Sequence, residues 1–68
     1  MQLSIHLLRR EDEVRRTLDR DGWNIQPEAG SGQMRARHPQ VSNESVARQR
    51  LNDLGLLTSR ECRIEFLP

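Results

Sequence analysis

Residues 41–56 constrain the fold more than any other stretch, because they carry the start, the apolar stripe and the end of a helix together. Ser42 is placed to accept hydrogen bonds from the amides of a first helical turn. Apolar residues then recur at helical spacing on one face, namely Ala47, Leu51 and Leu54. Gly55 follows where a left-handed residue commonly ends a helix. We therefore predict a helix over residues 43–54, with Ser42 as its N-cap.

An earlier segment repeats this pattern. Residues 11–21 begin with three carboxylates, which suit the positive end of a helix dipole, and Gly22 stands at the matching stop position. The two segments align at a constant offset, with Glu11 over Glu44, Leu18 over Leu51 and Gly22 over Gly55. We therefore predict a second helix over residues 11–21 and a strand-helix unit that is used twice.

Four runs alternate apolar and polar residues, which is typical of strands with one buried face. They cover residues 1–7, 23–28, 33–38 and 61–67. Pro27 cannot donate a ladder hydrogen bond, so it predicts that the second run is an edge strand. The turn Gly30-Ser31-Gly32 joins the second and third runs and predicts a β-hairpin.

The predicted order of elements is β-α-β-β-α-β. Right-handed crossovers in both halves then give an α+β two-layer sandwich, whose antiparallel sheet has the order 4-1-3-2 and carries both helices on one face. This is the ferredoxin-like fold, formed by residues 1–68 as a single small domain. The alternative is a winged helix with residues 42–57 as its recognition helix. That fold needs another helix within residues 22–41, which the prolines and glycines of this stretch disfavour.

Composition limits the size of the core and indicates the cellular compartment. Only 34% of the 68 residues are hydrophobic, so the core is thin. A single cysteine, Cys62, excludes an internal disulfide and a cysteine-cluster zinc site, which favours a reducing compartment. No apolar run is long enough to span a bilayer, and the first residues lack the pattern of a signal peptide. We expect a cytoplasmic protein with no membrane partner.

Positive and negative charges nearly balance, and arginine supplies all the basic residues other than histidine. Eleven arginines and no lysine stand against ten carboxylates, which leaves a net charge of +1. Arginine suits phosphate and carboxylate binding, yet its exclusive use equally indicates a GC-rich genome. A nearly neutral chain has no strong field that attracts nucleic acid. Nucleic-acid binding through arginine side chains is therefore the less favoured alternative.

The polar face of the predicted sheet holds the candidate ligand site. Four basic side chains fall on this face in neighbouring strands: His6, Arg35, Arg37 and Arg63. Together they predict a site for a small anion or a phosphate. The competing interpretation is cross-strand salt bridging, because Glu61 and Glu65 flank Arg63. No aromatic residue falls on this face, which disfavours recognition of RNA by base stacking.

No residue pattern predicts catalysis, a metal or a cofactor. His6 and His38 fall on opposite faces by parity, and no second cysteine completes a metal site. Cys62 shares the apolar face of the last strand and has no base predicted beside it. Nucleophile-base pairs and phosphate-binding loops are absent from the sequence. We expect no enzymatic activity.

Small size and a thin core favour a binding or assembly module that acts through protein-protein contact or a small anionic ligand. We expect self-association or docking on a protein partner. The last strand has no interior proline, so it is the better pairing edge, with the charged residues Glu61, Arg63 and Glu65. Trp23 and Leu51 are predicted as core anchors.

Overall fold

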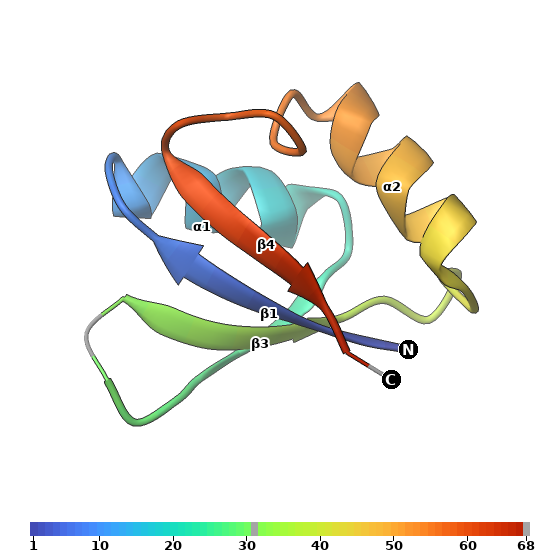
Figure 1. The fold of residues 1–68 in the computed structure, drawn as a ribbon, viewed down its shortest axis with the longest axis horizontal. Helices are drawn as coiled ribbons and strands as arrows, with labels where there is room; N and C mark the ends of the chain where they lie inside the picture. The colour runs from blue at the N-terminus through green and yellow to red at the C-terminus, as the bar shows by residue number, and fades with distance from the viewer. Residues whose placement is uncertain (31, 68) are drawn as a thin grey trace.

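The computed structural model describes residues 1–30 and 32–67. Its elements follow the predicted order (Figure 1): β1 (Gln2–Leu7), α1 (Glu11–Arg20), β2 (Asn24–Pro27), β3 (Gln33–Arg37), α2 (Glu44–Asp53) and β4 (Cys62–Phe66). Ser31, the middle residue of the predicted hairpin turn, lies outside the described residues.

The four strands form one antiparallel sheet in the order β2-β3-β1-β4, which confirms the predicted order 4-1-3-2. The topology is ferredoxin-like. β1 and β3 are the central strands, and β2 and β4 are the edges. The winged-helix alternative is wrong, because the stretch that would have to supply another helix forms the β2–β3 hairpin instead.

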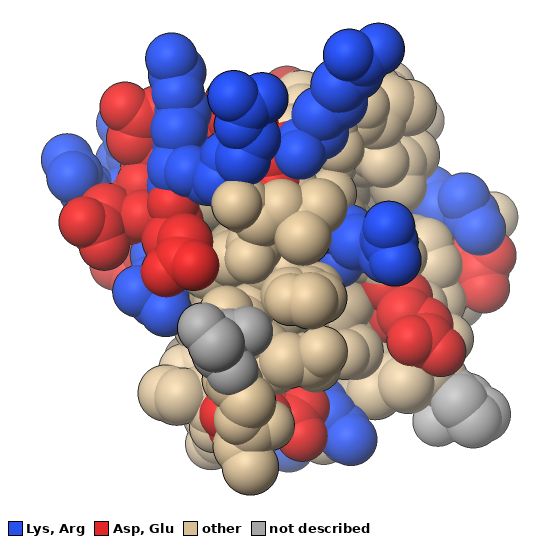
Figure 2. Space-filling model, turned by 60° about the vertical axis from the view of Figure 1, so that its left-hand side comes forward, with Lys and Arg blue, Asp and Glu red and all other residues tan. Residues whose placement is uncertain are grey.

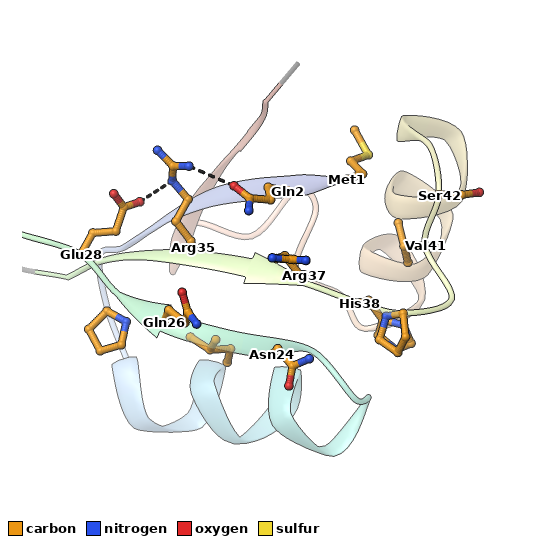
Figure 3. Close-up of a pocket in the computed structure, with 13 residues that line it drawn as sticks. Met1, Gln2, Asn24, Gln26, Glu28, Arg35, Arg37, His38, Val41 and Ser42 are labelled. Atoms are coloured by element: carbon orange, nitrogen blue, oxygen red, sulfur yellow. Dashed lines mark hydrogen bonds and ion pairs between the residues drawn. The ribbon is translucent and has the colours of Figure 1, made fainter.

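The core lies between the sheet and the two helices. Alternate residues of β1 and β3 are buried, as their apolar-polar alternation predicts. They form one cluster with residues of the helices and loops, whose largest fully buried members are Leu3, Ile5, Val14, Leu18, Met34 and Leu51. Both predicted anchors, Trp23 and Leu51, belong to this cluster. No helix or strand of residues 1–30 and 32–67 covers the opposite face of the sheet (Figures 1 and 3).

The helix ends agree with the sequence at the C-termini and differ at one N-terminus. Gly22 and Gly55 both adopt left-handed backbone conformations, with φ of 94° and 75°. The N-cap of α2 is Asn43, whose side chain accepts from the Val46 N–H at 3.0 Å. The prediction of Ser42 as N-cap is therefore wrong by one residue, because the neighbouring asparagine supplies an equally good acceptor one position closer to the helix.

His38 joins α1 to the segment that follows β3. Its ring is buried and stands edge-on to Trp23, with ring centroids 5.2 Å apart. Nε2 lies 2.6 Å from the backbone oxygen of Asp21, and Nδ1 accepts from the N–H of Gln40 at 3.1 Å. The tautomer that carries its proton on Nε2 satisfies both partners. The parity of the sequence placed His38 on the buried side but did not show what satisfies its two nitrogens.

Candidate functional site

The uncovered face of the sheet carries a shallow cavity of about 1030 Å³ at the end formed by β2, β3 and the start of β1 (Figure 3). Arg35 lines this cavity, and its guanidinium makes two side-chain hydrogen bonds. Its Nε donates to Glu28 Oε1 at 2.6 Å, and one terminal nitrogen donates to Gln2 Oε1 at 3.0 Å. The Glu28 carboxylate therefore neutralises the Arg35 guanidinium.

The structure divides the four predicted basic residues into two pairs. Arg35 and Arg37 line the cavity from β3. His6 and Arg63 face each other across β1 and β4 and do not line it. All four project from the same face, but they do not surround one common space. The four-residue anion site remains a prediction, and only its Arg35–Arg37 half has a cavity beside it.

Amide side chains that no sequence motif marks also line this cavity. Gln2 and Asn24 are the cross-strand neighbours of Arg37 on its two sides, and Gln26 is the β2 neighbour of Arg35. In the sequence these three amides occupy polar positions of the alternating segments 1–7 and 23–28. Only the strand register places them beside Arg35 and Arg37, and a single sequence does not determine that register.

The ion pairs near this face differ from the predicted cross-strand bridging of Arg63. Glu61 lies 3.8 Å from Arg10, which precedes α1, and Glu28 pairs with Arg35 of β3. Within residues 1–30 and 32–67, neither Arg63 nor Glu65 makes an ion pair, and both are exposed. Figure 2 shows arginines and carboxylates intermingled around an uncharged centre rather than separated into single-sign surfaces.

The second candidate surface is the outer edge of β4, whose hydrogen-bonding direction follows from its pairing with β1. The Leu8 N–H donates to the oxygen of Glu61 at 2.8 Å, and the Leu67 N–H donates to the oxygen of Gln2 at 3.2 Å. Antiparallel strands bond through alternate residues. The residues that turn their backbone groups toward β1 are therefore Glu61, Arg63, Glu65 and Leu67. Those that turn them away from the sheet are Cys62, Ile64 and Phe66.

The opposite edge, β2, offers fewer groups. The Glu28 N–H donates to the oxygen of Gln33 at 3.0 Å, so the same alternation turns Ile25 and Pro27 outward. Pro27 has no N–H, which leaves the Ile25 N–H as the donor that β2 turns outward. The position of Pro27 in an edge strand confirms its predicted role. β4 is thus the more complete edge for pairing.

The apolar side of β4 is incompletely covered. Ile64 and Phe66 pack against the core but remain partly exposed. The guanidinium of Arg48, on α2, lies 4.6 Å from the centre of the Phe66 ring. This cation-π contact covers part of the ring and leaves the outer side of the strand without a neighbouring chain.

Cys62 is buried beneath this edge. Its thiol lies 3.7 Å from the backbone oxygen of Leu56, to which it can donate. Burial, and secondarily the nearby Glu61 carboxylate, raises the pKa of the Cys62 thiol above its ordinary value. A thiol with a raised pKa is a poor nucleophile at neutral pH.

The described part of the chain offers neither a metal-ligand cluster nor a membrane-spanning helix. Nowhere in it do three or more histidine, cysteine, aspartate or glutamate side chains gather as they would around a metal ion. Neither of its helices has the length and apolar character needed to cross a membrane.

Comparison of the chain with models of protein families, with curated protein sequences and with solved structures finds no match.

Proposed function

We propose that this chain is an assembly module that joins a protein partner by adding a strand at the edge of β4. The observation that carries the proposal is the row of outward backbone groups of Cys62, Ile64 and Phe66, which no strand satisfies. An added strand would bond these groups through the same ladder that joins β4 to β1.

Two features of the strand support this reading. β4 contains no proline and no bulge that would block pairing, whereas β2 carries Pro27. Its partly exposed apolar residues, Ile64 and Phe66, would lose further contact with water beneath a neighbouring strand. Pairing therefore gains both backbone hydrogen bonds and apolar burial at the same edge.

A synthetic peptide with the sequence of residues 60–67, kept reduced, is a direct probe of this edge. At a protein concentration low enough for the chain to be monomeric, we expect the added peptide to slow amide hydrogen exchange at Ile64 by about tenfold or more at saturation, with similar slowing at Cys62 and Phe66. The amide of Ile25, which β2 turns outward, is the internal control and should keep its rate. Two-dimensional NMR reads these amides individually.

The matched control is the same peptide with Ile64→Pro, which removes the central N–H from the probe and leaves the protein unchanged. This peptide should protect none of the three amides. If the natural peptide at millimolar concentration leaves Ile64 exchanging at its free rate, strand addition at β4 is excluded.

A second candidate function, binding of a small anion, is favoured by one observation. Arg37 lines the cavity, is exposed, and makes no ion pair within residues 1–30 and 32–67. A guanidinium flanked by the amides of Gln2 and Asn24 offers donors to an oxyanion. Titration with inorganic phosphate should shift the NMR signals of these residues, and Arg37→Gln should abolish the shifts. Arg63→Gln is the matched control, and equal shifts in all three proteins would exclude a site at Arg37.

A further inference from the structure

We propose that the partner at this edge is a second copy of the same chain, joined to the first about a two-fold axis at Ile64. This inference rests on the proposed function and names its partner. In this register Ile64 stands opposite Ile64 of the second copy, and Arg63 stands opposite Glu65 of the second copy. The two sheets become one antiparallel sheet of eight strands.

The sequence of β4 selects this register by its charges. A two-fold axis at Arg63 would place two guanidinium groups opposite each other, and an axis at Glu65 would oppose two carboxylates. Like charges directly opposite each other destabilise an antiparallel pair. An axis at Ile64 instead gives two Arg63–Glu65 pairs, one on each side of the axis. Neither side chain has an ion-pair partner among the described residues of the single chain, so both are available.

The remaining symmetric registers overlap less. An axis at Cys62 or at Phe66 lies at an end of Cys62–Phe66 and leaves most of the strand without an opposite residue. The axis at Ile64 pairs the strand over its whole length. It also lies on a residue that turns both backbone groups outward, so the N–H and C=O of Ile64 bond to those of the second copy.

The two faces of this paired strand have different chemistry. On the uncovered face of the sheet the pairs are ionic. On the helix side they are apolar, with Ile64 against Ile64 of the second copy and Cys62 against Phe66 of the second copy. Ile64 and Phe66 are the two residues of β4 that are partly exposed on that side. Charge and apolar complementarity thus point to the same register.

Charge reversal tests the register directly. Arg63→Glu and Glu65→Arg each turn two attractive pairs into two repulsive ones, so each variant alone should dimerise roughly tenfold more weakly than the natural chain. An equimolar mixture of the two variants should form a heterodimer, because each repulsive pair becomes attractive. The double variant R63E/E65R should recover the homodimer. Sedimentation over a concentration range and native mass spectrometry distinguish these species.

Arg16→Glu is the matched control, since this residue is also an exposed arginine but lies on α1 and not on the sheet. It should dimerise like the natural chain. If the natural chain dimerises with Ile64 protected, but the charge reversals leave dimerisation unchanged, the proposed register is wrong while strand addition at β4 is still supported. If the natural chain stays monomeric while the peptide protects Ile64, the second copy is the wrong partner. If neither protects Ile64, the proposed function fails together with this inference.

Discussion

Arg50 and Asp21 tie the second helix to the end of the first, with Arg50 Nε donating to Asp21 Oδ2 over 2.8 Å. The same carboxylate oxygen accepts from Trp23 Nε1 at 2.9 Å. Asp21→Ala leaves both donors without this partner in partly buried surroundings. We expect it to lower the free energy of unfolding by about 1–3 kcal/mol, measured by urea titration.

The control for this prediction is Asp53→Ala, which removes only a hydrogen bond from Gln49 on the exposed side of α2. Its effect should stay within about 0.5 kcal/mol. Equal losses for the two variants would show that the shared carboxylate contributes no more than an ordinary surface residue.

Leu51 is fully buried in the core, so its truncation leaves a cavity. We expect Leu51→Ala to lower the free energy of unfolding by about 3–5 kcal/mol, which in so small a domain is enough to leave most molecules unfolded. Leu8→Ala removes the same atoms from a side chain that is 48% exposed and should change stability by about 0.5 kcal/mol or less. Similar melting temperatures for the two variants would contradict the placement of Leu51.

The two helix-ending glycines differ in the space around them. Both have positive φ, so alanine at either position costs about 1–2 kcal/mol of backbone strain. A Cβ at Gly22 would also lie 3.0 Å from His38 Nε2, whereas nothing lies within 4 Å of a Cβ at Gly55. We expect Gly22→Ala to destabilise the fold more than Gly55→Ala in thermal unfolding. The reverse order would contradict the packing of His38.

The raised pKa of the Cys62 thiol makes stability depend on pH in one direction. The folded protein holds this proton more tightly than the unfolded chain does. The stability that this thiol adds to the folded state is therefore fully present below the pKa of the unfolded thiol. It is lost as pH rises through the pKa of the folded thiol. Relative to Cys62→Ala, the natural chain should lose stability on the alkaline side only. Alkylation by iodoacetamide should be slow at pH 8 and become fast in urea, and fast labelling of the folded chain would contradict the burial of the thiol.

Much of the fold could be predicted because the sequence marks both strand parity and helix ends. Pro27, Gly22 and Gly55 each have a strong local conformational preference, and each lies where that preference predicts. The start of α1 shows the opposite case. Arg10, which precedes this helix, adopts a left-handed conformation with φ of 49°, which a non-glycine residue does not favour, and its side chain makes no capping hydrogen bond. No local pattern indicates such a start.

The candidate sites were only partly predictable, because they depend on register. Parity placed Arg35, Arg37 and Arg63 on one face, but their separation depends on how each strand is offset from its neighbour. The pairing of Arg35 with Glu28 likewise joins a residue of β3 to the residue that follows β2, and a single sequence does not state the offset between these strands. The direction of the backbone groups of β4 depends on the same offset.

Pro27 has a consequence for the size of any assembly. A sheet with two open edges can grow into a filament, because each added copy exposes another edge. Here Pro27 obstructs pairing at the β2 edge, so we expect growth through the proposed β4 contact to stop at two copies. Pro27→Val would reopen that edge, and we expect the concentrated variant to form species larger than the dimer in light scattering. In the proposed dimer, a single proline on the far side of the sheet would thus limit the stoichiometry of a contact that it does not touch.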